Sequence, residues 1–398
     1  LLTQHQQEDF GTLATSSENK PWEIPVIQDA TQEDFNGRLI IHKSDRIYIP
    51  LKSISDKVSN HLKHIAAFKN PEFYSKQAMR IPTYNIPRII CRADFTDEYL
   101  AMPRGCEDAI INMLYSLKID YEIVDNTNHG KPIGVTFKGK ERDEQLDAIN
   151  ALMPFSNGVL SATTAFGKTV TAAALIARRK TNTLILVHSK ALLMQWHERL
   201  SEFLDIDFTE DEISKKRGRK KAFSPVGCLD STSNTLHGVI DIALMQSCFE
   251  NDEVKPFIKG YGMVIVDECH HVSSITFENV LKHVTAHYVY GLTATPIRKD
   301  GLQPIIFMQC GPIRFSADAK AQIQKQSFQR YLVPRFTSYR PVTDDKQSFT
   351  ELSQSLAESE IRNNLIVEDV LNVVAAGRTP IILTARTSHV ELLAEMLK

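Results

Sequence analysis

The 398-residue sequence lacks the long apolar segments that place a protein in a membrane. No run approaches the ~18 consecutive apolar residues of a spanning helix. The N-terminus, LLTQHQQEDF, is polar and does not resemble a secretory signal peptide. No internal repeat at a fixed short period is visible. We therefore expect a globular protein without a membrane partner.

Cysteine pairs are also missing. The sequence has six cysteines at scattered positions, never in a C-x-x-C pair: Cys91, Cys106, Cys228, Cys248, Cys269 and Cys310. This pattern argues against a zinc ribbon or a disulfide framework, and it fits a reducing, cytoplasmic compartment.

An excess of one charge sign is missing too, because the formal net charge is −2. Any binding to nucleic acid must therefore come from a local basic surface.

Apolar and polar segments divide the chain into several parts. Residues 1–36 are polar, without a clear period, and are expected to form a tail or linker. Residues 37–137 hold short apolar runs, among them the alternating DRIYIP, around two helical patterns. This order predicts a small α/β accessory domain, which we expect to bind nucleic acid.

Between residues 138 and 320, nearly continuous apolar runs alternate with helical patterns. The runs are GVLSA, NTLILVH, IDIALM, MVIVDE and YVYGLTA. Such strands suit a parallel sheet buried on both faces, and the alternation predicts a doubly wound α/β domain. Residues 321–345 are a connector, and 346–398 begin a second α/β unit. Because the chain starts at Leu1 and stops within a helical pattern, we expect a piece of a longer protein.

A phosphate-binding loop is predicted where GVLSA meets the next helix. The spacing is A-x-x-x-x-G-K-T, with alanine in the usual first glycine position; a chance match in an Ala/Thr-rich helix start is the alternative. Backbone N–H groups and the helix dipole would hold phosphates. Lys168 would reach the β- and γ-phosphates, and the Thr169 hydroxyl would bind Mg²⁺. The loop residues are Ala162, Thr163, Thr164, Ala165, Phe166, Gly167, Lys168 and Thr169.

Two adjacent acids follow the apolar strand MVIV. Asp267 and Glu268 stand at its carboxyl end, where ligands bind in open α/β sheets. Asp267 suits coordination of Mg²⁺, and Glu268 suits orienting and deprotonating an attacking water. Alone, such a pair is often an exposed turn. With the loop, it predicts a catalytic site of Lys168, Asp267 and Glu268.

Three weaker signals surround these motifs. His270 could couple the nucleotide site to its neighbours, or it could be a capping or core histidine. Thr293 and Thr295, in the segment T-A-T, could sense the γ-phosphate. Upstream, Arg142 and Gln145 share one helical turn, and a glutamine amide can both donate to and accept from an adenine edge.

In this order, the glutamine, the loop, D-E-C-H and T-A-T resemble superfamily 2 helicases and translocases. GLTATPIRKDG and DECHH are most similar to the xeroderma-pigmentosum-B type repair helicases and to UvsW-type phage helicases. The phrases KPWE, AAFKNPEFYSKQAMR, LAMPRGC and TAFGKTVTAAALIARR resemble the helicase component of TOTE conflict-system proteins, from about residue 20 to 398. The resemblance implies RecA-like domains, ATP and Mg²⁺. It also implies a prokaryotic or phage-encoded protein, fused to or partnered with a primase-like or nuclease module. Ala162 stands where many relatives carry glycine. This difference bears on how tightly the loop folds, but not on the expected nucleotide binding.

The resemblance further implies contacts to a tracked nucleic-acid strand. Candidates from three segments are Ser189, Lys190, Gln195, Gln246, Ser247, Arg298 and Lys299. The alternative for the first segment is that Leu192, Leu193 and Trp196 are core and only Lys190 is exposed. Arg104, in MPRG, could hold a phosphate or mark a structural turn.

The run KKRGRKK, residues 215–221, holds six cations in seven residues and predicts an exposed loop. It is either a solvated insertion or a segment that binds duplex DNA. The second alternative rests on R-G-R, which resembles arginine segments that enter narrow A·T minor grooves. The candidate contacts in the run are Lys215, Lys216, Arg217 and Arg219.

Together these motifs predict an ATP-dependent helicase or translocase, on DNA rather than RNA, in phage defence, repair or replication restart. The alternatives are a motor subunit of a restriction-type complex and an ATP-switched nucleic-acid-binding scaffold. In this superfamily the second RecA-like domain supplies arginines to the γ-phosphate; Arg386 lies in its first motif but resembles a strand-contact position. We therefore expect the 398-residue piece to bind ATP but to hydrolyse it slowly.

Overall fold

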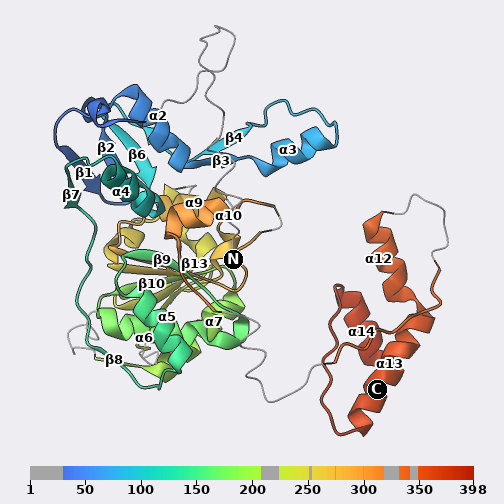
Figure 1. Cartoon of the computed structure of the whole chain (residues 1–398). Helices are drawn as coiled ribbons and strands as arrows, with labels where there is room; N and C mark the ends of the chain where they lie inside the picture. Colours follow the sequence, from blue (N-terminus) through green and yellow to red (C-terminus); the bar gives the residue numbers. More distant parts are fainter. Residues whose placement is uncertain are drawn as a thin grey trace. The chain divides into compact units, whose positions relative to one another are not determined.

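The computed structural model describes residues 30–207, 224–250, 253–273, 275–298, 300–317, 331–340 and 348–398 (Figure 1). The basic run at 215–221 and Lys299 lie outside the described residues, and the side chain of Thr164 is not described. The chain divides into two units, residues 1–325 and 326–398, and each is treated by itself. Within the described ranges, no helix is long and apolar enough to cross a bilayer.

The first domain is built on a mixed five-stranded sheet. Its order is β5-β6-β2-β1-β7, and within it only the pair of β1 and β7 is parallel. The strands are β1 (Leu39–Lys43), β2 (Arg46–Pro50), β5 (Asp94–Phe95), β6 (Tyr99–Pro103) and β7 (Tyr121–Asp125). The alternating segment DRIYIP thus forms β2, and its Ile47 and Ile49 are buried.

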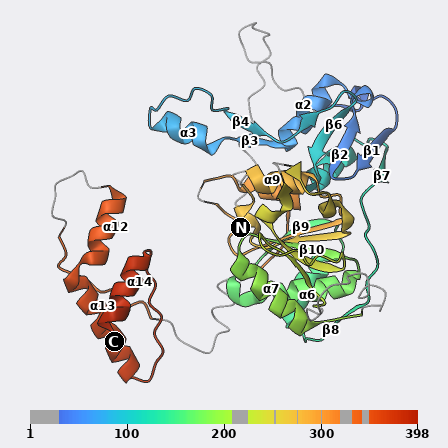
Figure 2. The same ribbon diagram turned by 180° about the vertical axis from the view of Figure 1, so that it is seen from behind.

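Helices α2 (Asp56–Ile65) and α4 (Glu107–Ser116) pack against this sheet through a shared apolar core. Ser55 accepts a hydrogen bond from the N–H of Val58, which caps α2. Ala30 and Phe35 belong to the same core, so the packed part of this domain already includes residues before 37. β3 (Ala67–Lys69), α3 (Pro71–Ala78) and β4 (Ile89–Cys91) extend from it as an arm (Figures 1 and 2).

The second domain holds a seven-stranded, wholly parallel sheet of order β12-β13-β10-β16-β17-β9-β18. The five apolar runs form its inner strands, which confirms the predicted doubly wound α/β fold. Strands β12 and β18 extend it at the two edges. The strands are β9 (Asn157–Ser161), β10 (Thr183–Val187), β12 (Gly227–Leu229), β13 (Ile240–Leu244), β16 (Met263–Val266), β17 (Tyr288–Thr293) and β18 (Ile313–Ser316).

Helices cover both faces of the parallel sheet (Figure 1). Successive residues of β10 point to opposite faces, because Ile185 and Val187 join one core and Leu184 and Leu186 the other. The helices are α5 (Asp143–Leu152), α6 (Lys168–Arg179) and α7 (Lys190–Phe203) against the first core, and α9 (Ile275–Lys282) and α10 (Gln303–Cys310) against the second. Shorter elements are β8 (Val135–Phe137), β11 (Leu204–Ile206), β14 (Phe249–Glu250) and β15 (Glu253–Val254). The 3₁₀ turns are η1 (Gln32–Asp34), η2 (Leu51–Ser53), η3 (Arg104–Cys106), η4 (Thr164–Phe166), η5 (Met245–Cys248), η6 (Pro256–Gly260) and η7 (Cys269–Ser273).

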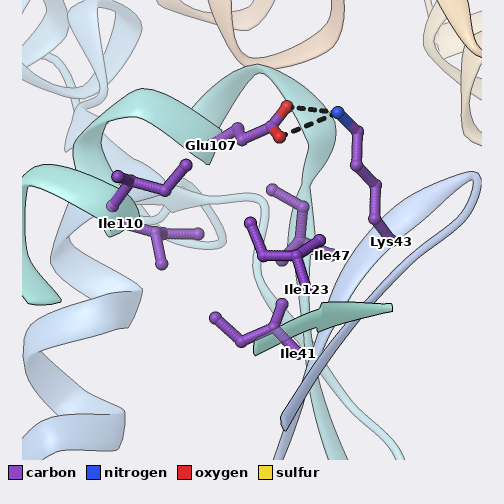
Figure 3. A pocket seen from close by; sticks show the side chains of 7 residues that line it. Ile41, Lys43, Ile47, Glu107, Ile110 and Ile123 are labelled. Atoms are coloured by element: carbon purple, nitrogen blue, oxygen red, sulfur yellow. Dashed lines mark hydrogen bonds and ion pairs between the residues drawn. The ribbon is translucent and has the colours of Figure 1, made fainter. Parts of the chain in front are cut away.

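A buried ion pair of the first domain holds a lysine that also bonds to the second domain. The Nζ atom of Lys43 donates to both carboxylate oxygens of Glu107, at 2.8 and 2.7 Å, beside a small apolar pocket (Figure 3). It also donates to the hydroxyl of Ser156, at 2.9 Å, one residue before β9. Because a buried charge is costly unless it is paired, this contact ties the accessory domain to the parallel sheet.

Arg104 adds a second buried contact across the same seam. Its guanidinium donates to the carbonyls of Ser44, at 2.8 Å, and Ala286, at 2.9 Å. Burial lowers the pKa of Arg104 to about 10. A Cβ on the neighbouring Gly105 would lie 1.9 Å from the carbonyl oxygen of Phe307, so only glycine fits there. The segment MPRG is therefore a structural turn, and the alternative of a phosphate-holding arginine is not supported.

The described part of residues 326–398 consists of three helices and non-helical segments. It contains α12 (Phe349–Glu358), α13 (Glu360–Ala375) and α14 (Thr387–Met396). The apolar segment before α14 forms no strand within the described residues, and Ile381 and Leu383 are 85% and 91% exposed. A parallel strand needs a neighbouring strand for its hydrogen bonds. The second α/β unit therefore stays a prediction.

Candidate nucleotide-binding site

The predicted motifs meet at one edge of the parallel sheet. Strands β16, β17 and β9 are neighbours and run in the same direction, so their carboxyl ends lie side by side. The N–H of Ala162, directly after β9, donates to the carbonyl of Thr293 at 2.9 Å. The N–H of Asp267, directly after β16, donates to the carbonyl of Leu186 at 3.0 Å. This is the edge where open α/β sheets bind their ligands.

Gly167 gives the loop its conformation. It has a φ of +86° and is the N-cap residue of α6, in the left-handed region that side chains rarely adopt. A Cβ at this position would lie 2.6 Å from Nε2 of Gln145. Both the backbone and the available space therefore require glycine here, although the rest of the loop has none.

Phe166 is compatible with a phosphate-binding loop because its side chain faces the protein interior. It is 1% exposed and belongs to the core that α5, α6 and α7 cover. Its ring packs against Phe315 of β18, with centroids 6.0 Å apart. The bulky residue thus anchors the loop and does not fill the space in front of α6.

The side chains of Arg142 and Gln145 hydrogen-bond to backbone carbonyls of the loop. Nε2 of Gln145 donates to the carbonyl of Phe166 at 2.9 Å, and its Oε1 accepts from the N–H of Arg142 at 3.0 Å. The guanidinium of Arg142 donates to the carbonyls of Phe166 and Ala165. Both ends of the Gln145 amide are thus engaged within the chain. That Gln145 reads adenine stays a prediction, and it would require these bonds to open.

Lys168 stands in the first turn of α6 and is only 7% exposed. Its Nζ atom donates to the carbonyl of Ala162 at 3.2 Å and lies 3.5 Å from Oε1 of Glu268. The structure therefore brings together the loop lysine and the acid of the D-E-C-H motif. Thr169 follows on the same turn and is half-buried.

Glu268 has an unusual backbone. Its φ is +45°, a left-handed conformation that costs on the order of 1–3 kcal/mol for a residue with a side chain. Its Oε2 atom is buried and accepts no hydrogen bond within the described structure, although Nδ1 of His270 lies 3.2 Å away. A carboxylate oxygen with spare accepting capacity suits a group that takes a proton from water.

Asp267 is held by a residue that sequence reasoning missed. Its Oδ2 accepts a hydrogen bond of 2.7 Å from the indole N–H of Trp196, and its Oδ1 accepts from the N–H of Glu268 at 3.0 Å. Burial raises the pKa of Asp267, while the indole N–H acts in the opposite direction. Trp196 is 1% exposed in α7. The signal that could have indicated this contact is chemical, because a buried tryptophan N–H needs a hydrogen-bond acceptor.

His270 contacts the T-A-T segment, and that it couples this segment to a nucleotide stays a prediction. Its Nδ1 lies 2.9 Å from Oγ1 of Thr293, which also accepts from the N–H of Thr295 at 3.1 Å. Burial lowers the pKa of His270, which favours the neutral imidazole. The rings of His270 and His271 lie 4.2 Å apart, and those of His271 and His188 4.3 Å apart. A row of histidines therefore links this site to the end of β10.

The proposed strand-contact residues adjoin that row. Ser189 caps α7 by accepting from the N–H of Leu192 at 3.3 Å. Lys190 is exposed and its Nζ atom lies 3.1 Å from Oδ2 of Asp230. The side chain of Gln246 donates to the carbonyl of His188 at 3.4 Å. The two segments predicted to contact nucleic acid thus lie beside each other.

The remaining candidates have mixed surroundings. Gln195 is exposed on α7 and Ser247 is half-buried, while Leu193 and Trp196 are buried, as the core alternative expected. Arg298 makes two hydrogen bonds to the carboxylate of Asp300, at 2.9 and 2.6 Å. Whether any of these residues contacts nucleic acid stays a prediction.

The residues present fit a nucleotide with Mg²⁺. The loop offers backbone N–H groups at a helix N-terminus, and Gly167 leaves open the space that a Cβ would fill. The hydroxyl of Thr169 and the carboxylate of Asp267 are hard oxygen ligands, which Mg²⁺ prefers.

Comparison with known proteins supports the same assignment. Residues 138–298 match the family described as "Type III restriction enzyme, res subunit". The chain is 29% identical over 275 residues to putative helicase 161L of Invertebrate iridescent virus 6, covering 67% of this chain and 57% of that protein. It is 27% identical over 200 residues to the DNA 3'-5' translocase XPB2 of Sulfurisphaera tokodaii, covering 50% and 41%.

The UvsW helicase of bacteriophage T4 is a structural neighbour with a TM-score of 0.49 and 14% identity, covering 70% of this chain and all of that one. The chain spans about half the length of the curated relatives it matches. Residues 138–298, in its second domain, are thus similar to the res subunit of type III restriction enzymes, and the chain is similar to viral putative helicases and to XPB-type DNA translocases and helicases.

Proposed function

We propose that this protein is an ATP-driven motor that moves along DNA. The observation that supports this most is the meeting of Lys168, Asp267 and Glu268 at the carboxyl edge of the sheet, at the N-terminus of α6. A binding scaffold needs no acid positioned to activate water. Two neighbouring acids, one held by hydrogen bonds and one with a spare oxygen, are what hydrolysis needs.

Nucleotide binding would exchange one partner of Lys168 for another. The ammonium of Lys168 lies 3.5 Å from the carboxylate of Glu268. The β- and γ-phosphates would take that place, because they carry more negative charge and lie over the helix N-terminus. Glu268 would then be released from Lys168 to orient water. Mg²⁺ held by Thr169 and Asp267 would neutralise charge that develops on the phosphates.

Two contacts connect this chemistry to the strand-contact segments. Thr293 and His270 link the T-A-T segment to Glu268, because His270 lies near both side chains. Trp196 links α7, whose first turn carries Lys190, to Asp267. A small shift of α7 on binding DNA would therefore move a hydrogen-bond donor at the proposed metal ligand.

Trp196→Phe should weaken the response of the ATPase to Mg²⁺. Phenylalanine keeps most of the ring volume but removes the N–H, and a hydrogen bond to a charged group is worth about 1.5–3 kcal/mol. We expect roughly a 10-fold loss of kcat or a comparable rise in the Mg²⁺ concentration for half-maximal activity, with Mg²⁺-free nucleotide affinity unchanged. Titration of ATPase activity with Mg²⁺ measures both quantities.

Met194→Ala is the matched control, because Met194 is 64% exposed on the same helix. It should leave the Mg²⁺ titration unchanged. If Trp196→Phe instead lowers nucleotide affinity with and without Mg²⁺ to the same extent, the indole has only a packing role.

DNA is the proposed track because XPB-type relatives carry DNA in their names and share 27% identity with this chain. The test is ATP hydrolysis by the whole protein with single-stranded DNA, duplex DNA, forked DNA and RNA. We expect DNA to stimulate hydrolysis more than RNA does. Stimulation by RNA alone would assign the motor to RNA.

Neutralising the basic run at 215–221 should reduce the salt dependence of duplex binding. Each lost phosphate contact lowers the slope of log K against log salt by ~0.9 on B-DNA. Duplex affinity of a variant with the run's six cations replaced by glutamine or serine is to be measured over a salt series. An unchanged slope would favour a solvated insertion.

The biological setting of the proposal is phage defence, in a TOTE-type conflict system. Its support is the shared phrases in TAFGKTVTAAALIARR and AAFKNPEFYSKQAMR. Plaque counts on cells with and without the intact gene test it, and equal counts would remove this setting. The matching family description favours one rival, a motor subunit of a restriction complex. DNA cleavage that requires this protein and a co-purifying partner would support that rival.

A further inference from the structure

Three side chains able to bind a metal meet where the chain passes from the first domain to the second. Asp125 ends β7, His129 follows four residues later, and His287 directly precedes β17. One ligand atom from each lies within 4.8 Å of the other two. Figure 1 shows the chain after β7 running along the side of the second domain toward β8. The group is separate from the nucleotide site, because it stands at the opposite, amino end of β17.

The backbone fixes the distance between these segments. The N–H of Asn128 donates to the carbonyl of Thr285 at 2.7 Å, and the N–H of His287 donates to the carbonyl of Asn128 at 2.8 Å. These bonds form a parallel bridge between Asn128 and Ala286. The rings of His129 and His287 consequently stack, with centroids 4.1 Å apart and planes 23° apart.

The carboxylate of Asp125 is also oriented in advance. Its Oδ1 atom accepts from both the N–H and the hydroxyl of Thr127, at 2.9 and 2.5 Å. Its Oδ2 atom is thereby directed at both imidazoles, 3.3 Å from Nε2 of His129 and 3.1 Å from Nδ1 of His287. Outer hydrogen bonds of this kind commonly orient a carboxylate that binds a metal.

We propose that Asp125, His129 and His287 bind a zinc-like divalent transition-metal ion. Zinc binds imidazole and carboxylate at about 2.0–2.2 Å, so neighbouring ligand atoms of a tetrahedral site lie roughly 3.3–3.5 Å apart. The two distances from Oδ2 come close to that spacing. Two imidazoles with one carboxylate suit zinc, cobalt or nickel, whereas Mg²⁺ and Ca²⁺ prefer oxygen ligands.

The exposure of the group agrees with such a site. The His129 side chain is 64% exposed and that of His287 only 18%, so an ion can enter from solvent while two ligands stay fixed. A water molecule would complete the tetrahedron. The ion would join the last strand of the first domain to β17 of the second, beside the bond from Arg104 to Ala286.

A metal-free arrangement uses the same atoms differently. Oγ1 of Thr127 lies 2.8 Å from Nδ1 of His287, so protons could join the histidines, the threonine and the carboxylate into a hydrogen-bonded cluster. The two arrangements differ in one measurable property, which is stoichiometric binding of the metal alone.

The test is titration of the whole protein with Zn²⁺ by calorimetry, with Mg²⁺ in excess to occupy the nucleotide site. We expect wild type to bind one more equivalent than His129→Ala, and to gain thermal stability that this variant does not gain. Asp125→Asn should bind at least about 10- to 100-fold more weakly, the loss that even an outer-shell change causes. With Co²⁺, wild type should show visible absorption bands of tetrahedral geometry that both variants lack.

His283→Ala is the control, because His283 is an exposed histidine whose Nδ1 bonds only within its own segment, to the carbonyl of Asn279 at 2.8 Å. It should bind Zn²⁺ as wild type does. Nucleotide affinity of each variant checks its folding independently of the metal. Equal Zn²⁺ binding by wild type and His129→Ala, or none by correctly folded wild type, would overturn the proposal.

Discussion

Replacing Lys168 by alanine should lower ATP hydrolysis by at least about 10²-fold and weaken nucleotide binding. The ammonium lies in the first turn of α6 and is only 7% exposed, so its charge acts in a site with little water to screen it. Removing one preorganised donor to a developing charge typically costs about 10²–10³ in kcat. Hydrolysis and binding of a fluorescent ATP analogue measure the two effects.

Lys180→Asn is the matched control for Lys168→Ala. Lys180 is the C-cap residue of the same helix, exposed and left-handed with a φ of +51°, a conformation that asparagine tolerates. It removes the same charge from the other end of α6 and should leave ATP hydrolysis unchanged. If Lys168→Ala retains wild-type hydrolysis, the nucleotide site has been placed wrongly.

Glu268→Gln should separate binding from catalysis. The amide keeps the shape of the side chain but cannot accept a proton, and loss of a general base typically costs about 10²–10⁴ in rate. We expect kcat to fall by that amount while affinity for ATP with Mg²⁺ stays within a few-fold of wild type. Single-turnover hydrolysis and equilibrium binding, measured on one preparation, give both values.

Equal loss of binding and turnover in Glu268→Gln would assign Glu268 a structural role instead. A structural role has a specific physical basis, because Glu268 also lies 3.5 Å from Lys168. The binding measurement tests this role. Glutamine removes this charge pair as well. Intact binding together with lost turnover would show that nucleotide binding does not need this charge pair and would leave Glu268 its catalytic role.

The second domain could be predicted well because its signals are local. The strand segments MVIV and YVYGLT are almost continuously apolar, and a strand buried on both faces requires this. The edge strands β12 and β18 were not predicted, because three or four residues at an edge carry little pattern. The segment after Ala66 turns into β3, which pairs with β4 over 20 residues later, and no local pattern indicates this pairing.

The candidate nucleotide site was predicted as a set of residues but not as a set of contacts. Lys168, Asp267 and Glu268 follow from spacing, because parallel strands place their carboxyl ends together. The bond from Trp196 to Asp267 joins residues 71 apart, and no sequence period encodes it. The left-handed backbone of Glu268 is likewise imposed by its surroundings, since glutamate has no preference for it.

For Gln145, the residue type does not decide between two roles. The sequence predicts an adenine-reading amide, and the structure shows the same amide holding the carbonyl of Phe166. Both roles use one donor and one acceptor, so the residue type alone cannot separate them.

Displacement of streptavidin from the end of biotinylated DNA tests the central proposal most directly, because it requires hydrolysis to produce movement. The whole protein should release streptavidin with ATP and Mg²⁺, from one strand end faster than from the other. It should release none with a non-hydrolysable analogue, and Glu268→Gln should release none with ATP. DNA-stimulated hydrolysis without any displacement would contradict the motor and leave an ATP-switched scaffold.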